Sequence, residues 1–219
     1  MDNMQQVIVV LETLLLVGPV AFYFIVLGLL NSRPASHLVD ARTDFLVLTA
    51  AACPLVLVPM VTVLRQGHSL ALVPVLAVAI LVMRAMLPRR DSGWVVYNLT
   101  RPRVRILVER SLRELGWEYR PVKGRLEVPD RALSIRFSAL PALRNVTCHL
   151  VFDRSADRAA TAAMLRARLE PALARQQLLP SAAGACLMML GVGMMILPFW
   201  MMSRHSDAIA EVVTRLLLS

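Results

Sequence analysis

The chain has 219 residues, of which 57% are hydrophobic and 18% are charged, and its mean hydropathy is +0.61. A water-soluble domain of this length is normally less apolar, so the composition excludes an ordinary soluble protein and indicates a membrane protein. The net charge of +9 arises entirely within residues 89–177, which hold 18 basic and 9 acidic residues, and three cysteines are too few for a disulfide framework.

Four apolar runs are long enough to cross a bilayer. They are 19 to 24 residues long, and a helix that rises about 1.5 Å per residue needs roughly 20 residues to cross the hydrocarbon core. Only the sequence RQGH separates the second run from the third, so we expect these two runs to form a tight helical hairpin. The predicted transmembrane helices are residues 7–30, 45–64, 69–87 and 180–202.

Arginine is distributed unequally between the two sides of this four-helix arrangement. Positively charged segments next to membrane helices tend to stay in the cytoplasm. We therefore expect a multi-pass protein of the cell inner membrane, with residues 89–179 in the cytoplasm and both termini outside. The arginines near the membrane are Arg33, Arg42, Arg84, Arg89, Arg90 and Arg175 on the first side, against Arg65 and Arg204 on the other.

The segment between the third and fourth runs has the pattern of a small folded domain. The apolar spacing in RVRILVERSLREL predicts a helix that Thr100 caps and Gly116 ends. Alternating apolar residues predict strands on both sides of it, and the alanine-rich residues 155–177 predict a second helix. The order β-α-β-β-β-α indicates an antiparallel sheet with its helices on one face. The predicted strands are 94–99, 125–129, 132–138 and 146–152.

Residues 206–218, after the fourth run, have the spacing of an amphipathic helix. The fold class expected is thus a membrane all-α protein of four transmembrane helices, with an inserted α+β domain and this tail helix. The domains are residues 1–88 with three transmembrane helices, the basic domain 89–179, and residues 180–219 with the fourth helix and the tail. The apolar stripe of the tail is Ile209, Val212, Val213, Leu216 and Leu217.

Five arginines are candidates for contact with the membrane or a partner. Arg89 and Arg90 follow the third run directly, where each can interact with anionic headgroups at about 1 kcal/mol. Arg101, Arg103 and Arg105 begin a helix, where cations oppose the helix dipole, which suggests a positive patch that is either tolerated or useful. Surfaces that bind single-stranded nucleic acid combine basic and aromatic side chains. The aromatic residues here fall largely on predicted strand or core faces, so we expect anionic lipid or a protein partner rather than nucleic acid.

Two ionisable residues lie within the predicted membrane helices. Arg84 is in the last turn of the third helix and is expected to extend its side chain to the headgroups. Glu12 lies five residues into the first helix. Charges inside a membrane are costly and often functional, so Glu12 could belong to an ion pathway or a buried pair. Alternatively, it lies near the outer membrane surface, or the membrane helix begins after it at Thr13.

The sequence offers few candidates for chemistry. The scattered histidines and cysteines predict no metal site, and we expect no cofactor because the chain has no glycine-rich phosphate loop. Ser36, His37 and Asp40 are close together after the first run, which allows a nucleophile and a base. Such triples also arise by chance in polar loops, and Asp40 is equally suited to cap the next helix.

These features predict a non-enzymatic integral membrane subunit that acts as a scaffold, adaptor or regulator in a larger membrane complex. Its expected partners are other integral membrane proteins and anionic lipid headgroups, with a second copy of the chain as a further option. The alternative is a small transporter or channel with Glu12 in its pathway. A third hypothesis is an enzyme that acts on membrane lipids through the Ser36 loop.

Overall fold

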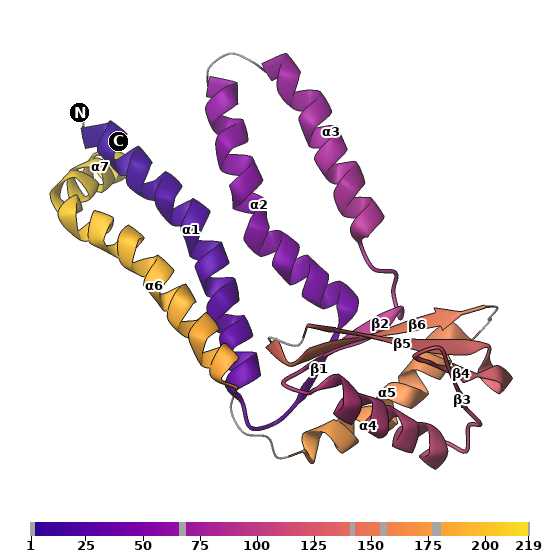
Figure 1. Ribbon diagram of the computed structural model, residues 1–219. Coiled ribbons are helices and arrows are strands. Elements are labelled where there is room, and N and C mark those ends of the chain that lie inside the picture. Colours follow the sequence, from indigo (N-terminus) through magenta and orange to yellow (C-terminus); the bar gives the residue numbers. More distant parts are fainter. Residues whose placement is uncertain (1–2, 66–68, 141–142, 154–156, 177–180, 219) are drawn as a thin grey trace. The chain divides into compact units, whose positions relative to one another are not determined.

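The chain is mostly helical, with one antiparallel six-stranded sheet and three long apolar helices (Figure 1). It divides into two compact units, which we name the helical unit and the α+β unit. The helical unit comprises Met1–Leu27, Val47–Met86 and Leu187–Ser219, and the α+β unit comprises Gly28–Leu46 and Leu87–Cys186. This computed structural model describes residues 3–65, 69–140, 143–153, 157–176 and 181–218.

Each of the four apolar runs forms a helix. Three of these helices, α1, α2 and α6, are long and apolar enough to cross a membrane. In α3 the stretch Val73–Met86 is apolar but shorter. Length and composition therefore support three membrane spans among the described residues. The predicted hairpin loop includes residues 66–68, which lie outside the described residues. The four helices are α1 (Asn3–Ser32), α2 (Ala41–Arg65), α3 (Ser69–Met86) and α6 (Ala182–Arg204).

A glycine in α6 allows α1 to approach it closely. A Cβ atom on Gly191 would lie 2.6 Å from the carbonyl oxygen of Ala21 and 2.7 Å from Cγ1 of Ile25. Interfaces between membrane helices use small residues for this reason. Gly191 is therefore a packing position, whereas no atom lies within 4 Å of a Cβ built on Gly193.

The predicted tail helix is present as α7 (Ser206–Leu218). Its residues Ala208 and Val212 are buried against Val7 of α1, and Ile209 packs beside them. The described part of the stripe is therefore only partly covered, because Val213 remains 47% exposed. The side chains of Leu216 and Leu217 lie outside the described part of the structure.

The sheet of the α+β unit has six antiparallel strands, in the order β1-β2-β6-β5-β4-β3. Four of them match the predicted strands. The other two, at the edges of the sheet, were not predicted: β1 lies in the loop between the first two membrane helices, and β3 contains Pro121. Proline is accepted at a sheet edge because it lacks an N–H donor. The strands are β1 (His37–Asp40), β2 (Gly93–Tyr97), β3 (Arg120–Val122), β4 (Arg125–Val128), β5 (Leu133–Leu140) and β6 (Asn145–Phe152).

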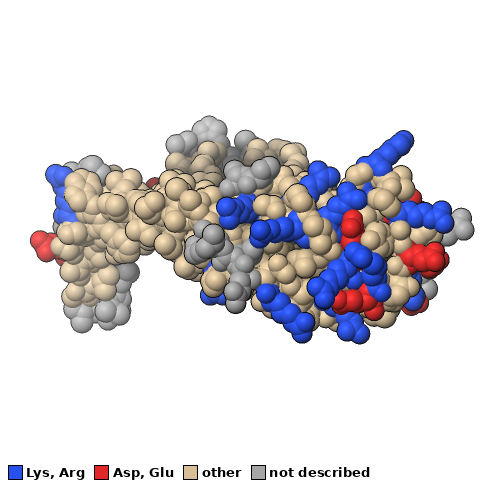
Figure 2. Space-filling view, turned by 60° about the horizontal axis from the view of Figure 1, so that its bottom comes forward, with Lys and Arg blue, Asp and Glu red and all other residues tan. Residues whose placement is uncertain are grey.

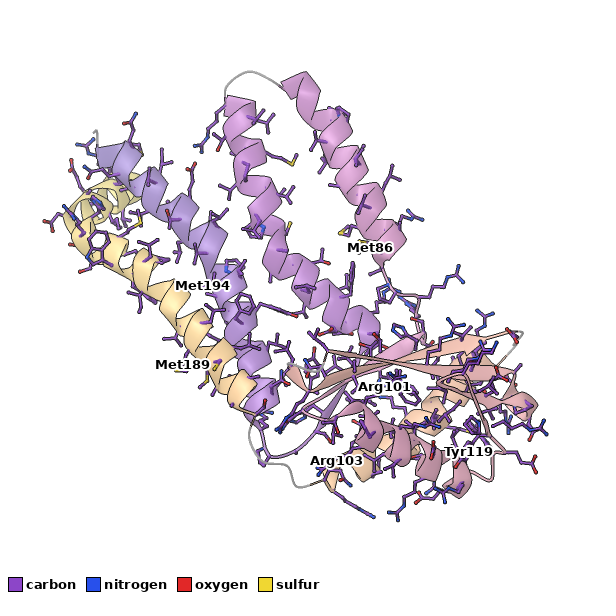
Figure 3. The ribbon with its side chains drawn as sticks, in the orientation of Figure 1. Met86, Arg101, Arg103, Tyr119, Met189 and Met194 are labelled. Atoms are coloured by element: carbon purple, nitrogen blue, oxygen red, sulfur yellow. The ribbon has the colours of Figure 1, made fainter. Side chains whose placement is uncertain are left out.

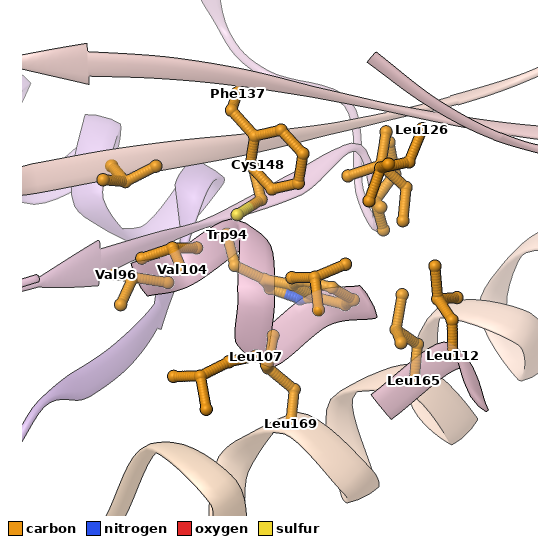
Figure 4. Close-up of a cluster of buried hydrophobic side chains, with 14 of the residues drawn as sticks. Trp94, Val96, Val104, Leu107, Leu112, Leu126, Phe137, Cys148, Leu165 and Leu169 are labelled. Atoms are coloured by element: carbon orange, nitrogen blue, oxygen red, sulfur yellow. The ribbon is translucent and has the colours of Figure 1, made fainter. Parts of the chain in front are cut away.

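Two helices, α4 (Arg101–Glu114) and α5 (Arg158–Ala174), cover the same face of this sheet (Figure 1), as the predicted order of elements indicated. Alternate residues of the strands face these helices and form a continuous apolar core with them (Figure 4). The apolar residues at helical spacing in α4 and the alternating apolar residues of β5 and β6 face this core. Buried members of the core include Trp94, Val96, Leu107, Leu112, Leu126, Ile135, Phe137, Cys148, Leu165 and Leu169.

The end of α4 follows the signal in the sequence. Gly116 has a positive φ of 70°, and its N–H donates to the carbonyl oxygen of Arg113 at 3.0 Å. The N–H of Trp117 donates to the carbonyl oxygen of Leu112 at 2.9 Å. This pair of bonds is the Schellman motif, which satisfies the last carbonyl groups of the helix and turns the chain toward β3.

The thiol of Cys148 is expected to be unreactive in the folded protein. Burial among the core side chains raises its pKa to about 12, and only the thiolate reacts readily with alkylating reagents. In protein carrying Cys53→Ser and Cys186→Ser, a maleimide should label Cys148 only after denaturation. Ser138→Cys, on the exposed side of β5, is the control and should react in the native state. Comparable native labelling rates at both positions would contradict the core described above.

Candidate functional site

The three arginines predicted at the start of α4 have different surroundings. Arg101 and Arg103 are exposed at the beginning of the helix (Figure 3), whereas Nε of Arg105 donates to Oε1 of Glu109 at 2.7 Å. The charge of Arg105 is therefore offset within its own helix. Only two of these three predicted contact residues present a charge without an ion-pair partner among the described residues.

Arg101 lies at the rim of a pocket beside the first turn of α4. The pocket has a volume of about 340 Å³, its rim includes Arg144, and Leu99 and Val146 contribute apolar walls. Thr100 is the N-cap residue, but its side chain makes no capping hydrogen bond. The helix therefore begins with arginines and without the hydroxyl cap that the sequence suggested.

A second basic pocket lies between α4 and α5. This α4–α5 groove has a volume of about 190 Å³. Its walls combine apolar groups with three guanidinium groups, one carboxylate and one amide, so it is suited to an anionic group carried on a partly apolar chain. It is lined by Leu107, Arg110, Glu114, Ala167, Arg168, Pro171, Ala172, Arg175 and Gln176.

The charges around the α4–α5 groove are only partly balanced. Nε of Arg110 lies 2.9 Å from Oε1 of Glu114, so this pair is neutral overall. No carboxylate among the described residues forms an ion pair with Arg168 or Arg175, and both side chains are exposed. Figure 2, which turns this side of the α+β unit forward, shows lysine and arginine gathered over it. The groove therefore retains about two uncompensated positive charges.

The sequence contained a signal for this groove that was overlooked. Arg168 and Arg175 are seven residues apart in an alanine-rich helix, so they lie on one side of it two turns apart. Leu165, Leu169 and Leu173 occupy the buried side. The contribution of Arg110 depends on how α4 packs against α5, and no local pattern in the chain contains that information.

The predicted membrane anchors lie at the end of α3. Arg84 is exposed in its last turn, and Arg89 and Arg90 are exposed in the turn that follows. The N–H of Ser92 donates to the carbonyl oxygen of Arg89 at 3.3 Å, which closes this turn. The two arginines are thus held just before β2.

Glu12 forms an ion pair. Nη1 of Arg65, the last residue of α2, lies 3.1 Å from Oε1 of Glu12. Arginine at the end of a membrane helix is expected at the bilayer surface. The pair therefore accounts for Glu12 without a transported ion.

Ser36 and Asp40 make structural hydrogen bonds, and His37 is a strand residue of β1 that lies opposite Tyr97. The hydroxyl group of Ser36 is buried and donates to the carbonyl oxygen of Leu173 at 2.8 Å. Asp40 caps α2, because its Oδ1 accepts from the N–H of Arg42 at 2.8 Å. Burial and, to a smaller extent, the nearby Arg33 lower the pKa of His37. The triple thus joins β1 to α5 and α2.

The described residues contain no group of three or more histidine, cysteine or acidic side chains that could hold a metal ion. The α4–α5 groove and the pocket beside Arg101 are two basic pockets among the described residues.

No protein-family model matches the chain, and no curated protein or solved structure is significantly similar to it.

Proposed function

We propose that this protein is a non-catalytic integral membrane subunit that holds its α+β unit at the cytoplasmic side of the inner membrane. The α4–α5 groove binds an acidic segment of a protein partner, and the subunit acts in its complex as a scaffold or adaptor. The observation that carries the proposal is the pair of arginines, Arg168 and Arg175, that border the groove without a carboxylate partner among the described residues.

The composition of the groove favours a peptide over a small ion. Ala167, Pro171 and Ala172 give it apolar walls, next to the guanidinium groups. Arginine binds carboxylates through two parallel hydrogen bonds, which gives both affinity and orientation. A segment with acidic and apolar residues matches both parts of this surface.

Strand pairing supports a membrane topology with four spans. β1 precedes α2 and β2 follows α3, yet these strands pair in one sheet, with Leu38 opposite Val96. Both strands must be on one side of the membrane, so the chain crosses it an even number of times between them. Since α2 has the length and apolarity of a span, we infer that α3 also crosses.

The same argument applies to the ends of the chain. α1 leads into β1 and α6 follows α5, so both helices leave the α+β unit for the opposite side of the membrane. The contact of Val7 with Ala208 and Val212 is consistent with an N-terminus and an α7 that share that side. The surplus of arginine next to the α+β unit favours the cytoplasm for it.

The hydrogen bonds of Ser36 and Asp40 support a non-catalytic role for the protein. Ser36 bonds to a backbone carbonyl and Asp40 caps a helix, so neither is arranged to activate a nucleophile. The ion pair of Glu12 with Arg65 similarly gives the carboxylate a structural partner.

Charge reversal in the groove is expected to abolish partner binding. In native membranes, a photo-reactive amino acid at Ala167 should cross-link to a stoichiometric acidic partner. The double variant Arg168→Glu and Arg175→Glu should lose this product, because two attractions become repulsions. Like-charge juxtaposition at an interface costs several kcal/mol.

The matched control is Arg120→Glu with Lys123→Glu, two exposed residues outside the groove. It changes the net charge of the unit equally and should keep the cross-linked product. Loss of the product in both double variants, or in neither, would contradict a role for the groove. A purified protein that turns over a lipid substrate would contradict the non-catalytic role.

A further inference from the structure

The face of the sheet that points away from α4 and α5 has its own charge pattern. Trp94 and Val96 belong to the core, so their neighbours Val95 and Tyr97 point to the opposite side. The register continues this outer face across β6 and β5, where it includes His149 and Arg136.

Basic side chains form a row across the outer face. Gly93 is in register with His149, His149 with Arg136, and Arg136 with Arg125. Arg125 is paired with Glu127 at 2.6 Å, whereas Arg136 and His149 are exposed. Like charges directly opposite each other in a sheet are unfavourable. Arg125 is neutralised by Glu127, but Arg136 lies opposite it with no ion-pair partner of its own among the described residues, which points to an external anion.

The turn with Arg89 and Arg90 extends this row. The N–H of Leu150 donates to the carbonyl oxygen of Ser92 at 2.7 Å, which fastens the turn beside His149. Both arginines are exposed, and Asp91 is the acidic residue in the turn. The row therefore runs from the end of α3 to β4.

The beginning of α2 identifies what lies over this face. The hydroxyl group of Tyr97 donates to Oδ1 of Asp44, so the first turns of α2 start on the outer face. Asp44 is the last charged residue before the apolar run of α2, which begins at Phe45. Because a helix rises only about 1.5 Å per residue, Tyr97 lies within about one turn of the hydrocarbon.

We propose that the outer face of the sheet rests on the headgroups of anionic phospholipids, and that Arg136, His149, Arg89 and Arg90 contact their phosphates. This rests on the proposed membrane insertion and assigns the lipid and the protein partner to opposite faces of one sheet. The α4–α5 groove lies on the side that lipid does not reach. Anionic lipid is the occupant because this face starts at a membrane helix and is basic, and such segments are attracted to anionic headgroups.

The test uses the full chain in nanodiscs of phosphatidylcholine and phosphatidylglycerol, with Cys53→Ser and Cys186→Ser. One protein carries a fluorophore at Ser138→Cys on the outer face, and the other carries it at Ile106→Cys, which is 60% exposed on α4. A lipid with a nitroxide on its headgroup then quenches fluorophores at the membrane surface. Strong quenching is expected at Ser138→Cys and little at Ile106→Cys.

A second comparison tests the charges. Arg136→Glu with His149→Glu should remove most of the quenching at Ser138→Cys that depends on phosphatidylglycerol. Arg166→Glu on α5 should leave it unchanged. Equal quenching at both probes, or none in discs that retain the protein, would overturn the proposal and leave membrane insertion intact. Failure of the protein to remain in the discs would overturn insertion itself.

Discussion

Gly93→Ala is expected to prevent the sheet of the α+β unit from forming correctly. A Cβ atom at this position would lie 2.1 Å from the carbonyl oxygen of Cys148 and 3.2 Å from Cα of His149. Both atoms belong to the backbone of the neighbouring strand β6, so a change of side-chain rotamer cannot relieve the clash. The φ of 156° adds strain for any residue with a side chain. We expect a loss of about 4 kcal/mol or more in the free energy of unfolding, in the range that marks severe substitutions.

Gly116→Ala is the matched control. Gly116 also has a positive φ, of 70°, but no atom lies within 4 Å of a Cβ built on it. Its cost should be that of the left-handed conformation alone, about 1–2 kcal/mol. Thermal unfolding of the full chain in detergent, followed by tryptophan fluorescence, measures both variants. Equal stabilities of the two variants would mean that β2 and β6 do not approach as closely as described.

Gly191→Leu is expected to separate α1 from α6. The new side chain would begin 2.6 Å from the carbonyl oxygen of Ala21 and 3.0 Å from the backbone nitrogen of Ile25. Overpacking of this kind typically costs about 1–3 kcal/mol, and more where backbone must move. A loss of about 3 kcal/mol lowers the melting temperature of a protein of this size by roughly 6–12 °C.

Gly193→Leu provides the comparison for this second substitution. It makes the same chemical change in the same helix, where a Cβ meets no atom within 4 Å. Its melting temperature in detergent should stay close to that of the unmodified protein. If Gly193→Leu is as destabilising as Gly191→Leu, the effect belongs to glycine in α6 generally and not to the contact with α1.

Local sequence patterns were sufficient to predict the helices and strands whose apolar residues recur at a regular spacing. The helical spacing of Val104, Leu107, Val108 and Leu112 predicts the buried side of α4, and all four are buried. The signal at Gly116 predicts the end of that helix. These elements bury enough apolar surface for their period to appear in the sequence.

The missed elements lack such a period. β1 has only four residues and exists because β2 offers it hydrogen-bonding partners, as in the pair of Leu38 with Val96. β3 contains Pro121, which argues against a strand in any local reading. Strands of this kind depend on a partner that is distant in the chain.

The candidate sites also differ in whether a local stretch of sequence is enough to predict them. The prediction that Arg89 and Arg90 contact the membrane needs only their place after an apolar run. The row of Arg125, Arg136 and His149 depends on strand register, and the α4–α5 groove depends on two helices packing together. Neither arrangement is present in any continuous stretch of the chain.

On the four-span topology proposed above, the position of β1 couples the synthesis of the protein to its insertion into the membrane. The ribosome delivers β1 before α2 and α3, and it delivers the partner strand β2 only after them. If α2 and α3 are threaded incorrectly during synthesis, the two strands emerge in different compartments and cannot meet. β2 is then left without its partner β1. A chain whose helical hairpin is misplaced therefore exposes an open strand edge, a feature that proteases and chaperones recognise.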